Sequence, residues 1–116
     1  MANKSTVQPC FVLQQYVPTE ALDNPKVEAA LDEIVTLAGG ATVKPAVGVW
    51  LPGDGHKPIE EGVVIVEVLV LADKAEAVAI KFDALADAQI AAGQSLVLTT
   101  TRHPDGTTLL VSTSAE

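Results

Sequence analysis

One carboxylate inside an otherwise aliphatic run is the residue of this sequence best suited to chemistry. Glu67 lies in residues 62–71, GVVIVEVLVL, and because side chains alternate along a strand, both faces of this strand are apolar. Burial disfavours the charged carboxylate, so its pKa rises towards neutrality, where a general acid or base works best. We therefore hypothesise that Glu67 is catalytic. The alternative is that it pairs with Lys44 or Arg102, or lies at a strand end that water reaches.

The two histidines are the other candidates for chemistry. His56 follows Asp54 by two positions, and His103 precedes Asp105 by two. A metal site needs three or four converging ligands, and the two loops that carry these residues join different pairs of strands. We predict that both histidines are surface turn residues, with no metal site. The single cysteine, Cys10, allows no internal disulfide, and no phosphate-binding loop or nucleophile elbow occurs, so no cofactor is predicted.

The elements that must position these residues begin with a strand and a helix. Residues 1–9 are polar and predicted to be a flexible N-terminus, and residues 10–116 form one predicted domain that begins with a strand at 10–17. A helix follows: Asn24 is a good N-cap, Pro25 suits the first helical position, and Gly39 supplies a stop. Its apolar residues recur at spacings of three and four, which predicts one buried stripe.

The middle of the chain predicts two strands and a second helix. Residues 42–50 read as a strand that Pro45 places at an edge or at a bulge, because proline cannot donate to a strand ladder. A loop rich in proline and glycine then leads to the strand at 62–71. Residues 73–76, DKAE, predict a capping box that opens a helix running to about Ala92.

The chain ends in a predicted hairpin, whose strands at 95–101 and 107–114 flank a Pro-Asp-Gly turn. The order is therefore βαββαβ with one extra strand. This is the α+β, ferredoxin-like plan: an antiparallel sheet with two helices on one face. Right-handed crossovers place the first and third strands at the centre of the sheet, and the C-terminal hairpin extends one edge.

The face of the sheet that the helices leave open is predicted to be a mixture of apolar and polar side chains. We expect it to be too apolar to face water, and hence to be a dimer interface, a ligand cavity or both. Four of its residues are predicted to bind a ligand or partner: Gln14, Tyr16, Trp50 and Thr99. The full predicted set is Val12, Gln14, Tyr16, Trp50, Ile65, Glu67, Leu69, Val97 and Thr99.

Five short stretches carry a resemblance to a known family. They are GATV at 40–43, G-x-W at 48–50, Asp54-Gly55, a glutamate at 60 or 61 before an apolar strand, and AAGQSLVL at 91–98. Together they cover about half of the chain. The sequence resembles an uncharacterised family of small bacterial proteins of the dimeric α+β barrel type. The resemblance implies the fold and homodimers but no activity, since this group includes cofactor-free oxygenases, isomerases and lactone-forming enzymes as well as binding proteins.

Composition narrows the choice of partners. The 116 residues carry a net charge of -8, which repels nucleic acid and anionic membrane surfaces. No apolar leader or membrane-spanning run occurs, so we expect a cytoplasmic protein.

The leading hypothesis is a small, acidic, homodimeric, non-catalytic binding or accessory protein of unknown specific function. Its open sheet face would engage a second copy, a protein partner or a small apolar ligand. Its size and lack of motifs are also typical of phages and mobile elements. The alternative is a cofactor-free enzyme, isomerase-like or oxygenase-like, that acts on a small organic molecule in a sheet-face pocket with Glu67 as proton acceptor. A closed cavity holding Glu67 would favour the enzyme.

Overall fold

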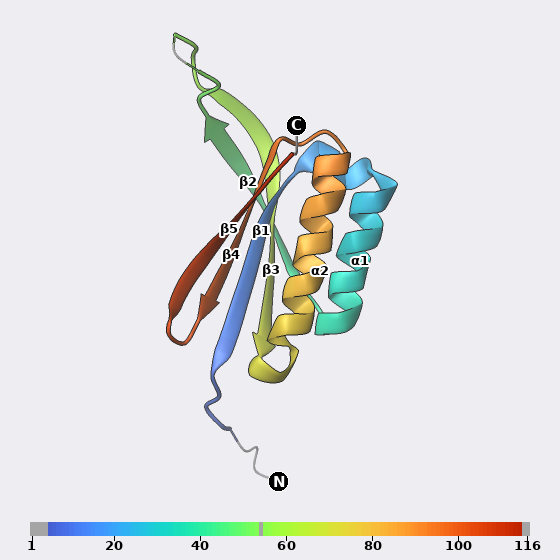
Figure 1. The fold of residues 1–116 in the computed structure, drawn as a ribbon, viewed down its shortest axis with the longest axis vertical. Coiled ribbons are helices and arrows are strands. Elements are labelled where there is room, and N and C mark those ends of the chain that lie inside the picture. The colour runs from blue at the N-terminus through green and yellow to red at the C-terminus, as the bar shows by residue number, and fades with distance from the viewer. Residues whose placement is uncertain (1–4, 54, 115–116) are drawn as a thin grey trace.

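The fold is an α+β sandwich with one sheet and one layer of helices (Figure 1). The computed structural model describes residues 5–53 and 55–114. Its elements are β1 (Cys10–Pro18), the short 3-10 helix η1 (Thr19–Asp23), α1 (Pro25–Ala38), β2 (Thr42–Trp50), β3 (Ile59–Leu71), α2 (Ala72–Ala91), β4 (Leu96–His103) and β5 (Gly106–Thr113). The five strands are antiparallel in the order β2-β3-β1-β4-β5, so the predicted ferredoxin-like fold with an extra C-terminal strand is confirmed.

The two helices begin in different ways. At α1 the Asn24 side chain accepts hydrogen bonds from the backbone N–H groups of Lys26 and Val27, and Gly39 ends the helix with a φ of 85°, as predicted. The predicted capping box at 73–76 is wrong, because α2 begins at Ala72 without any side-chain cap. Strand β3 runs directly into α2, which places Asp73 inside the first turn, where its carboxylate faces the positive end of the helix dipole.

The core lies between the helices and one face of the sheet. Both helices pack on the same side, as Figure 1 shows. Alternate residues of β1 and β3 fill this space, and Phe82 and Leu85 of α2 close it; Leu13, Val66 and Phe82 are each 1% exposed or less. The aliphatic run of β3 is thus explained on one face by helix packing.

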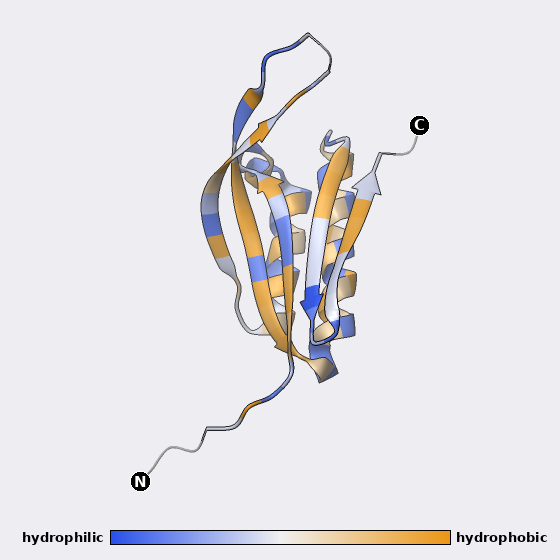
Figure 2. Ribbon diagram, turned by 90° about the vertical axis from the view of Figure 1, so that its left-hand side faces the viewer, coloured by the Kyte–Doolittle hydropathy of each residue, from blue (hydrophilic) through white to orange (hydrophobic). Residues whose placement is uncertain are grey.

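The open face of the sheet exposes apolar side chains to solvent. Figure 2 colours the strands by hydropathy and shows that hydrophobic residues run along them. Residues directly opposite each other in an antiparallel pair point to the same side. Gln14 pairs with Glu67 and Tyr16 pairs with Ile65, and all four lie on the open face as predicted. Eight large side chains of this face are exposed: Tyr16, Trp50, Ile59, Leu69, Leu71, Leu96, Leu109 and Val111.

The predicted placement of Val97 and Thr99 on this open face is wrong. Thr99 pairs with Gln15, whose side chain points to the helices, so Thr99 and Val97 are buried on the helix side. Residues 96–101 of β4 are apolar or hydroxylic on both faces, so their pattern does not show which set faces the helices.

Strands β2 and β3 continue past the rest of the sheet as a two-stranded arm, at the top of Figure 1. The predicted N-terminal segment 1–9 lies partly outside the described residues, and residues 5–9 have no regular secondary structure. Within the described ranges, no helix is long and apolar enough to cross a membrane.

Candidate functional site

Glu67 is held by partners on the open face. The Gln14 side-chain amide donates a hydrogen bond to its carboxylate, and the Lys44 ammonium lies 3.3 Å from the same oxygen. The Gln14 hydrogen bond and the charge of Lys44 outweigh desolvation and hold the pKa of Glu67 below its ordinary value. The expected raised pKa is therefore wrong, and the alternative of pairing with Lys44 is confirmed. A lowered pKa makes the Glu67 carboxylate a weaker proton acceptor than the raised pKa expected from its apolar strand would have done.

Thr99 belongs to a buried polar cluster on the helix side. The Gln15 amide donates to the Phe82 carbonyl at 2.9 Å and to the Thr99 hydroxyl at 2.8 Å, while Gln89 donates to the Gln15 carbonyl oxygen at 2.7 Å. Both glutamines are fully buried. The Gln89 Oε1 has no hydrogen-bond partner among the described residues. This cluster joins β1, α2 and β4, so we interpret Thr99 as a residue that stabilises the fold.

The two histidines lie at opposite ends of the molecule. His56 follows the tip of the β2–β3 arm, and His103 ends β4 at the other end of the sheet (Figure 1). The His103 ring stacks on Phe11 with 6.3 Å between ring centroids. Asp54 lies outside the described residues. Among residues 5–53 and 55–114, no three His, Cys, Asp or Glu side chains form a group that could hold a metal ion.

A pocket forms where β1 and β4 separate. Their pairing runs from Val12–Arg102 to Gln15–Thr99 and ends there, whereas β4 stays paired with β5 as far as Leu96. The space between the separated strands is closed on the third side by the root of the β2–β3 arm. The resulting cavity has a volume of about 390 Å³. Small-molecule sites have volumes of roughly 300–1,000 Å³, so it can hold a small organic ligand.

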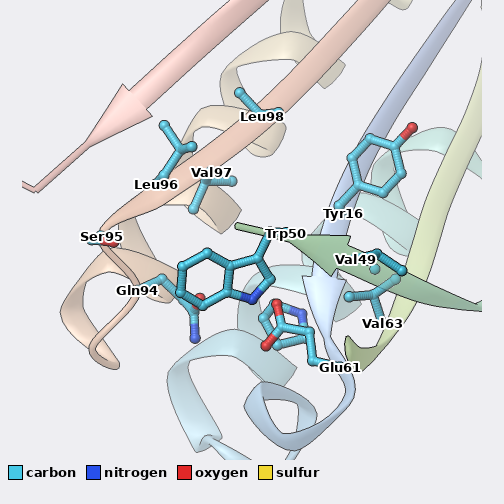
Figure 3. A pocket seen from close by; sticks show the side chains of 12 residues that line it. Tyr16, Val49, Trp50, Glu61, Val63, Gln94, Ser95, Leu96, Val97 and Leu98 are labelled. Atoms are coloured by element: carbon cyan, nitrogen blue, oxygen red, sulfur yellow. The ribbon is translucent and has the colours of Figure 1, made fainter. Parts of the chain in front are cut away.

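The lining of this pocket is mostly apolar, with two aromatic rings and one carboxylate. Figure 3 shows Trp50 and Glu61 reaching the space from β2 and β3, with Leu96 and Val97 bounding it from β4. Among the residues that the structure describes, no lysine, arginine or histidine lines it. The lining residues are Tyr16, Pro18, Gly48, Val49, Trp50, Glu61, Val63, Gln94, Ser95, Leu96, Val97 and Leu98.

This arrangement suits an organic cation with an aromatic part. The faces of tryptophan and tyrosine rings attract cations, and the Glu61 carboxylate adds a full negative charge. Gly48 leaves room beside these groups, since a Cβ there would lie 3.4 Å from Val63 and 3.8 Å from Glu61. A second cavity of about 580 Å³ lies beside η1 and shares Glu61.

The pocket includes some of the predicted site residues and excludes others. Tyr16 and Trp50 both line it, whereas Gln14 and Glu67 do not. Glu67 lies six residues along β3 from Glu61, which is about 20 Å at the rise of an extended strand. Sequence reasoning did not select Glu61 as a site residue. The signal was nonetheless present, because G-x-W at 48–50, the glutamate at 61 and part of AAGQSLVL converge on this pocket from three separate segments.

Comparisons with known proteins identify the fold but no family. No protein-family model matches the chain, and no curated protein matches it in sequence. A phage SAM lyase in complex with S-methyl-5′-thioadenosine aligns over 97% of this chain and 96% of its own, with a TM-score of 0.65 and 14% identity. A phage SAM lyase in its apo state aligns over 100% and 98%, with a TM-score of 0.66 and 13% identity.

A third solved structure shares the same plan. The B. subtilis GlnK–ATP complex aligns over 92% of this chain and 84% of its own, with a TM-score of 0.50 and 15% identity. At these identities the likeness concerns the fold alone. The chain is therefore a small α+β protein of ferredoxin-like fold.

Proposed function

We propose that this protein is a cofactor-free lyase that cleaves a sulfonium nucleoside, S-adenosylmethionine, in the pocket at the root of the β2–β3 arm. The observation that carries the proposal is the composition of that pocket: Trp50, Tyr16 and Glu61 with no cationic side chain. The likeness to phage SAM lyases supports it, because it extends over nearly the whole of both chains. This favours the enzyme hypothesis over the non-catalytic one and moves the site from Glu67 to Glu61.

The charge of the substrate fits the charge of the protein. A sulfonium is a soft, weakly hydrated cation that aromatic faces accept, as they accept quaternary ammonium groups. The chain carries a net charge of -8, which attracts a cation and disfavours anionic ligands. The aromatic rings of Trp50 and Tyr16 also offer a surface on which a purine base can stack.

The reaction needs little from the side chains beyond binding and orientation. When the bond between the sulfonium sulfur and the γ-carbon of the methionine chain breaks, its electron pair goes to sulfur, which leaves as the neutral thioether of S-methyl-5′-thioadenosine. As this bond breaks, the carboxylate of the same substrate bonds to the γ-carbon from the side opposite the sulfur and closes a lactone, so no proton has to be removed. A pocket that holds the substrate in a folded conformation supplies the required proximity of the carboxylate to the γ-carbon.

The fluorescence of Trp50 provides a direct test, because it is the only tryptophan of the chain. We expect S-methyl-5′-thioadenosine to change this emission on titration and S-adenosylmethionine to be converted to it, as followed by chromatography. Glu61→Gln should weaken S-adenosylmethionine binding about tenfold, or about 1.4 kcal/mol, while the neutral thioether binds as before. Glu60→Gln is the matched control, since Glu60 points to the other side of β3. Absence of both binding and turnover would refute the proposal.

A second candidate function is a non-catalytic binding protein that associates with itself through the open sheet face. The eight exposed apolar side chains of that face favour it, since monomers rarely expose so large a patch. The two candidates separate on turnover: a binding protein would give the Trp50 titration without any conversion of S-adenosylmethionine. Self-association is common to both candidates, because the face has to be covered in either case.

A further inference from the structure

The end of α2 fixes the position of Gln94 at one wall of the pocket. The backbone N–H of Gly93 donates to the Ile90 carbonyl at 3.0 Å. The backbone N–H of Gln94 donates to the Gln89 carbonyl, also at 3.0 Å. With Gly93 at a φ of 112°, these two hydrogen bonds form a Schellman motif, which is a common helix end. Gln89 is fully buried and hydrogen-bonded to Gln15, so the backbone of Gln94 is attached to a rigid part of the core.

The side chain of Gln94 is unusual for its place in this motif. The residue two positions past the helix cap is frequently apolar and packs back on the last turn. Gln94 is instead a half-buried polar residue that lines the pocket, and in Figure 3 it lies next to the indole of Trp50. Its side-chain amide makes no hydrogen bond to any other residue that the structure describes. Positions that break a local rule in this way are expected at functional sites.

The other polar side chains of the pocket lack the hydrogen-bonding pattern of a primary amide. Within the described lining they are Tyr16, Trp50, Glu61 and Ser95. The indole only donates, an ionised carboxylate only accepts, and each hydroxyl offers a single oxygen atom. Among the described lining residues, the Gln94 side chain alone therefore presents a donor and an acceptor side by side in one plane.

Adenine presents the complementary pair of groups. Its 6-amino group donates and lies beside a ring nitrogen that accepts, and the amides of glutamine and asparagine pair with both groups at once. A base that stacks on Trp50 covers its flat face, so its edge remains to be paired. An edge left unpaired would weaken binding, because buried donors and acceptors without partners are costly.

We propose that Gln94 determines the specificity of the pocket for adenine. Its amide oxygen accepts a hydrogen bond from the 6-amino group, and its amide N–H donates to the neighbouring ring nitrogen, while the base stacks on Trp50. An aromatic ring accepts any flat base, and the Glu61 carboxylate attracts any cation, so neither distinguishes one nucleoside from another. This inference rests on the proposed function, because it takes an adenine nucleoside as the ligand.

The test compares two ligands that differ only at position 6 of the base. They are S-methyl-5′-thioadenosine and its analogue with hydrogen in place of the 6-amino group, and isothermal titration calorimetry gives both dissociation constants. We expect the wild type to prefer the first ligand at least about tenfold, which is the usual discrimination of a bidentate amide. Gln94→Met keeps the length of the side chain and removes the amide, so this preference should fall to about twofold or less. Such a cycle isolates the contact between the amide and the amino group.

Two controls accompany this comparison. Gln8→Met makes the same change at an exposed position outside the pocket and should keep the wild-type preference. Gln94→Met should stay folded, because no described hydrogen bond is lost and an apolar residue suits this position of a Schellman motif. Circular dichroism and thermal unfolding check this, and Gln94→Leu repeats the comparison if the methionine variant is unfolded.

The outcomes separate this inference from the proposed function. A preference that is equal in the wild type and in Gln94→Met would overturn the role of Gln94, even if the wild type converts S-adenosylmethionine. A preference that Gln8→Met also loses would overturn it as well. If Gln94→Met alone loses the preference but the wild type does not convert S-adenosylmethionine, recognition of adenine is supported and the lyase is refuted. If the wild type binds neither nucleoside, both proposals are refuted.

Discussion

At the scale of single residues, the pKa of a carboxylate depends on its hydrogen-bond and ion-pair partners as much as on its burial. Glu67 was the natural catalytic candidate because its strand is aliphatic on both faces. Its neighbours on the open face, Gln14 and Lys44, come from strands 53 and 23 residues away in the chain and keep it ionised. Alternation along one strand shows which residues share a face with Glu67 but not which of them lie opposite it. The lowered pKa of Glu67 could therefore be predicted only with knowledge of the strand register.

The Glu67 network predicts a specific pH dependence of stability. Because the pKa of Glu67 is lower in the folded protein than its ordinary value of 4.5, its contribution is fully present above about pH 4.5 and is lost as the pH falls through the folded-state pKa. Glu67→Gln should lower the free energy of unfolding at pH 7 by up to about 1 kcal/mol, because Lys44 is half exposed. The difference from wild type should close on acidification, as measured by urea unfolding. Asp32→Asn, on the exposed side of α1, is the control, and a gap that widens below pH 4 would contradict the assignment.

The buried amide cluster predicts that its two glutamines are unequal. Gln15→Leu removes the partner of the Phe82 carbonyl, of Thr99 and of Gln89, and each is left buried without its hydrogen bond. We expect a loss of about 1–3 kcal/mol in the free energy of unfolding. Gln89→Leu should cost clearly less, because it also removes the unpartnered Oε1. Thermal and urea unfolding of the two variants measure the difference, and equal losses would show that Oε1 is satisfied in solution.

At the scale of elements, the sequence predicted the ends of α1 and the order of the strands, but it missed the start of α2 and the side of the sheet on which the residues of β4 lie. The Asn24 cap, the Pro25 start and the Gly39 stop of α1 were all predictable because they involve neighbours in the chain. The edge position of β2 followed from Pro45. The side on which Thr99 lies did not, since β4 offers a similar pattern in either register. The length of the arm and the separation of β1 from β4 were also beyond local patterns, and together they create the pocket.

The end of α1 gives a prediction with an internal control. Gly39 adopts a φ of +85°, which side-chain-bearing residues rarely adopt, whereas the adjacent Gly40 does not, and a Cβ at either position would meet nothing within 4 Å. Gly39→Ala should therefore destabilise the protein by about 1–2 kcal/mol through backbone strain alone. Gly40→Ala should be neutral or should stabilise it by up to about 1 kcal/mol. Chemical denaturation of both variants tests this, and equal effects would show that the helix end is not held in the left-handed conformation.

At the scale of the whole molecule, charge and apolar surface act against each other. The net charge of -8 repels other copies, while the open sheet face and the arm expose uncharged apolar side chains that favour association. The prediction of self-association came from the second face of β3, which the helices cannot cover. The structure adds the β2–β3 arm as a further surface with exposed apolar side chains.

This balance predicts that salt strengthens self-association. Repulsion between acidic copies is screened as the ionic strength rises, whereas burial of apolar surface is not weakened. The dissociation constant of the oligomer, measured by sedimentation at 20 mM and 500 mM sodium chloride, should fall at the higher concentration. Leu109→Asp/Val111→Asp, which places charge on the open sheet face, should be monomeric at both salt concentrations. If salt instead loosened the oligomer, the copies would be held by ion pairs, and Lys44 and Arg102 of the open face would be the cations to test first.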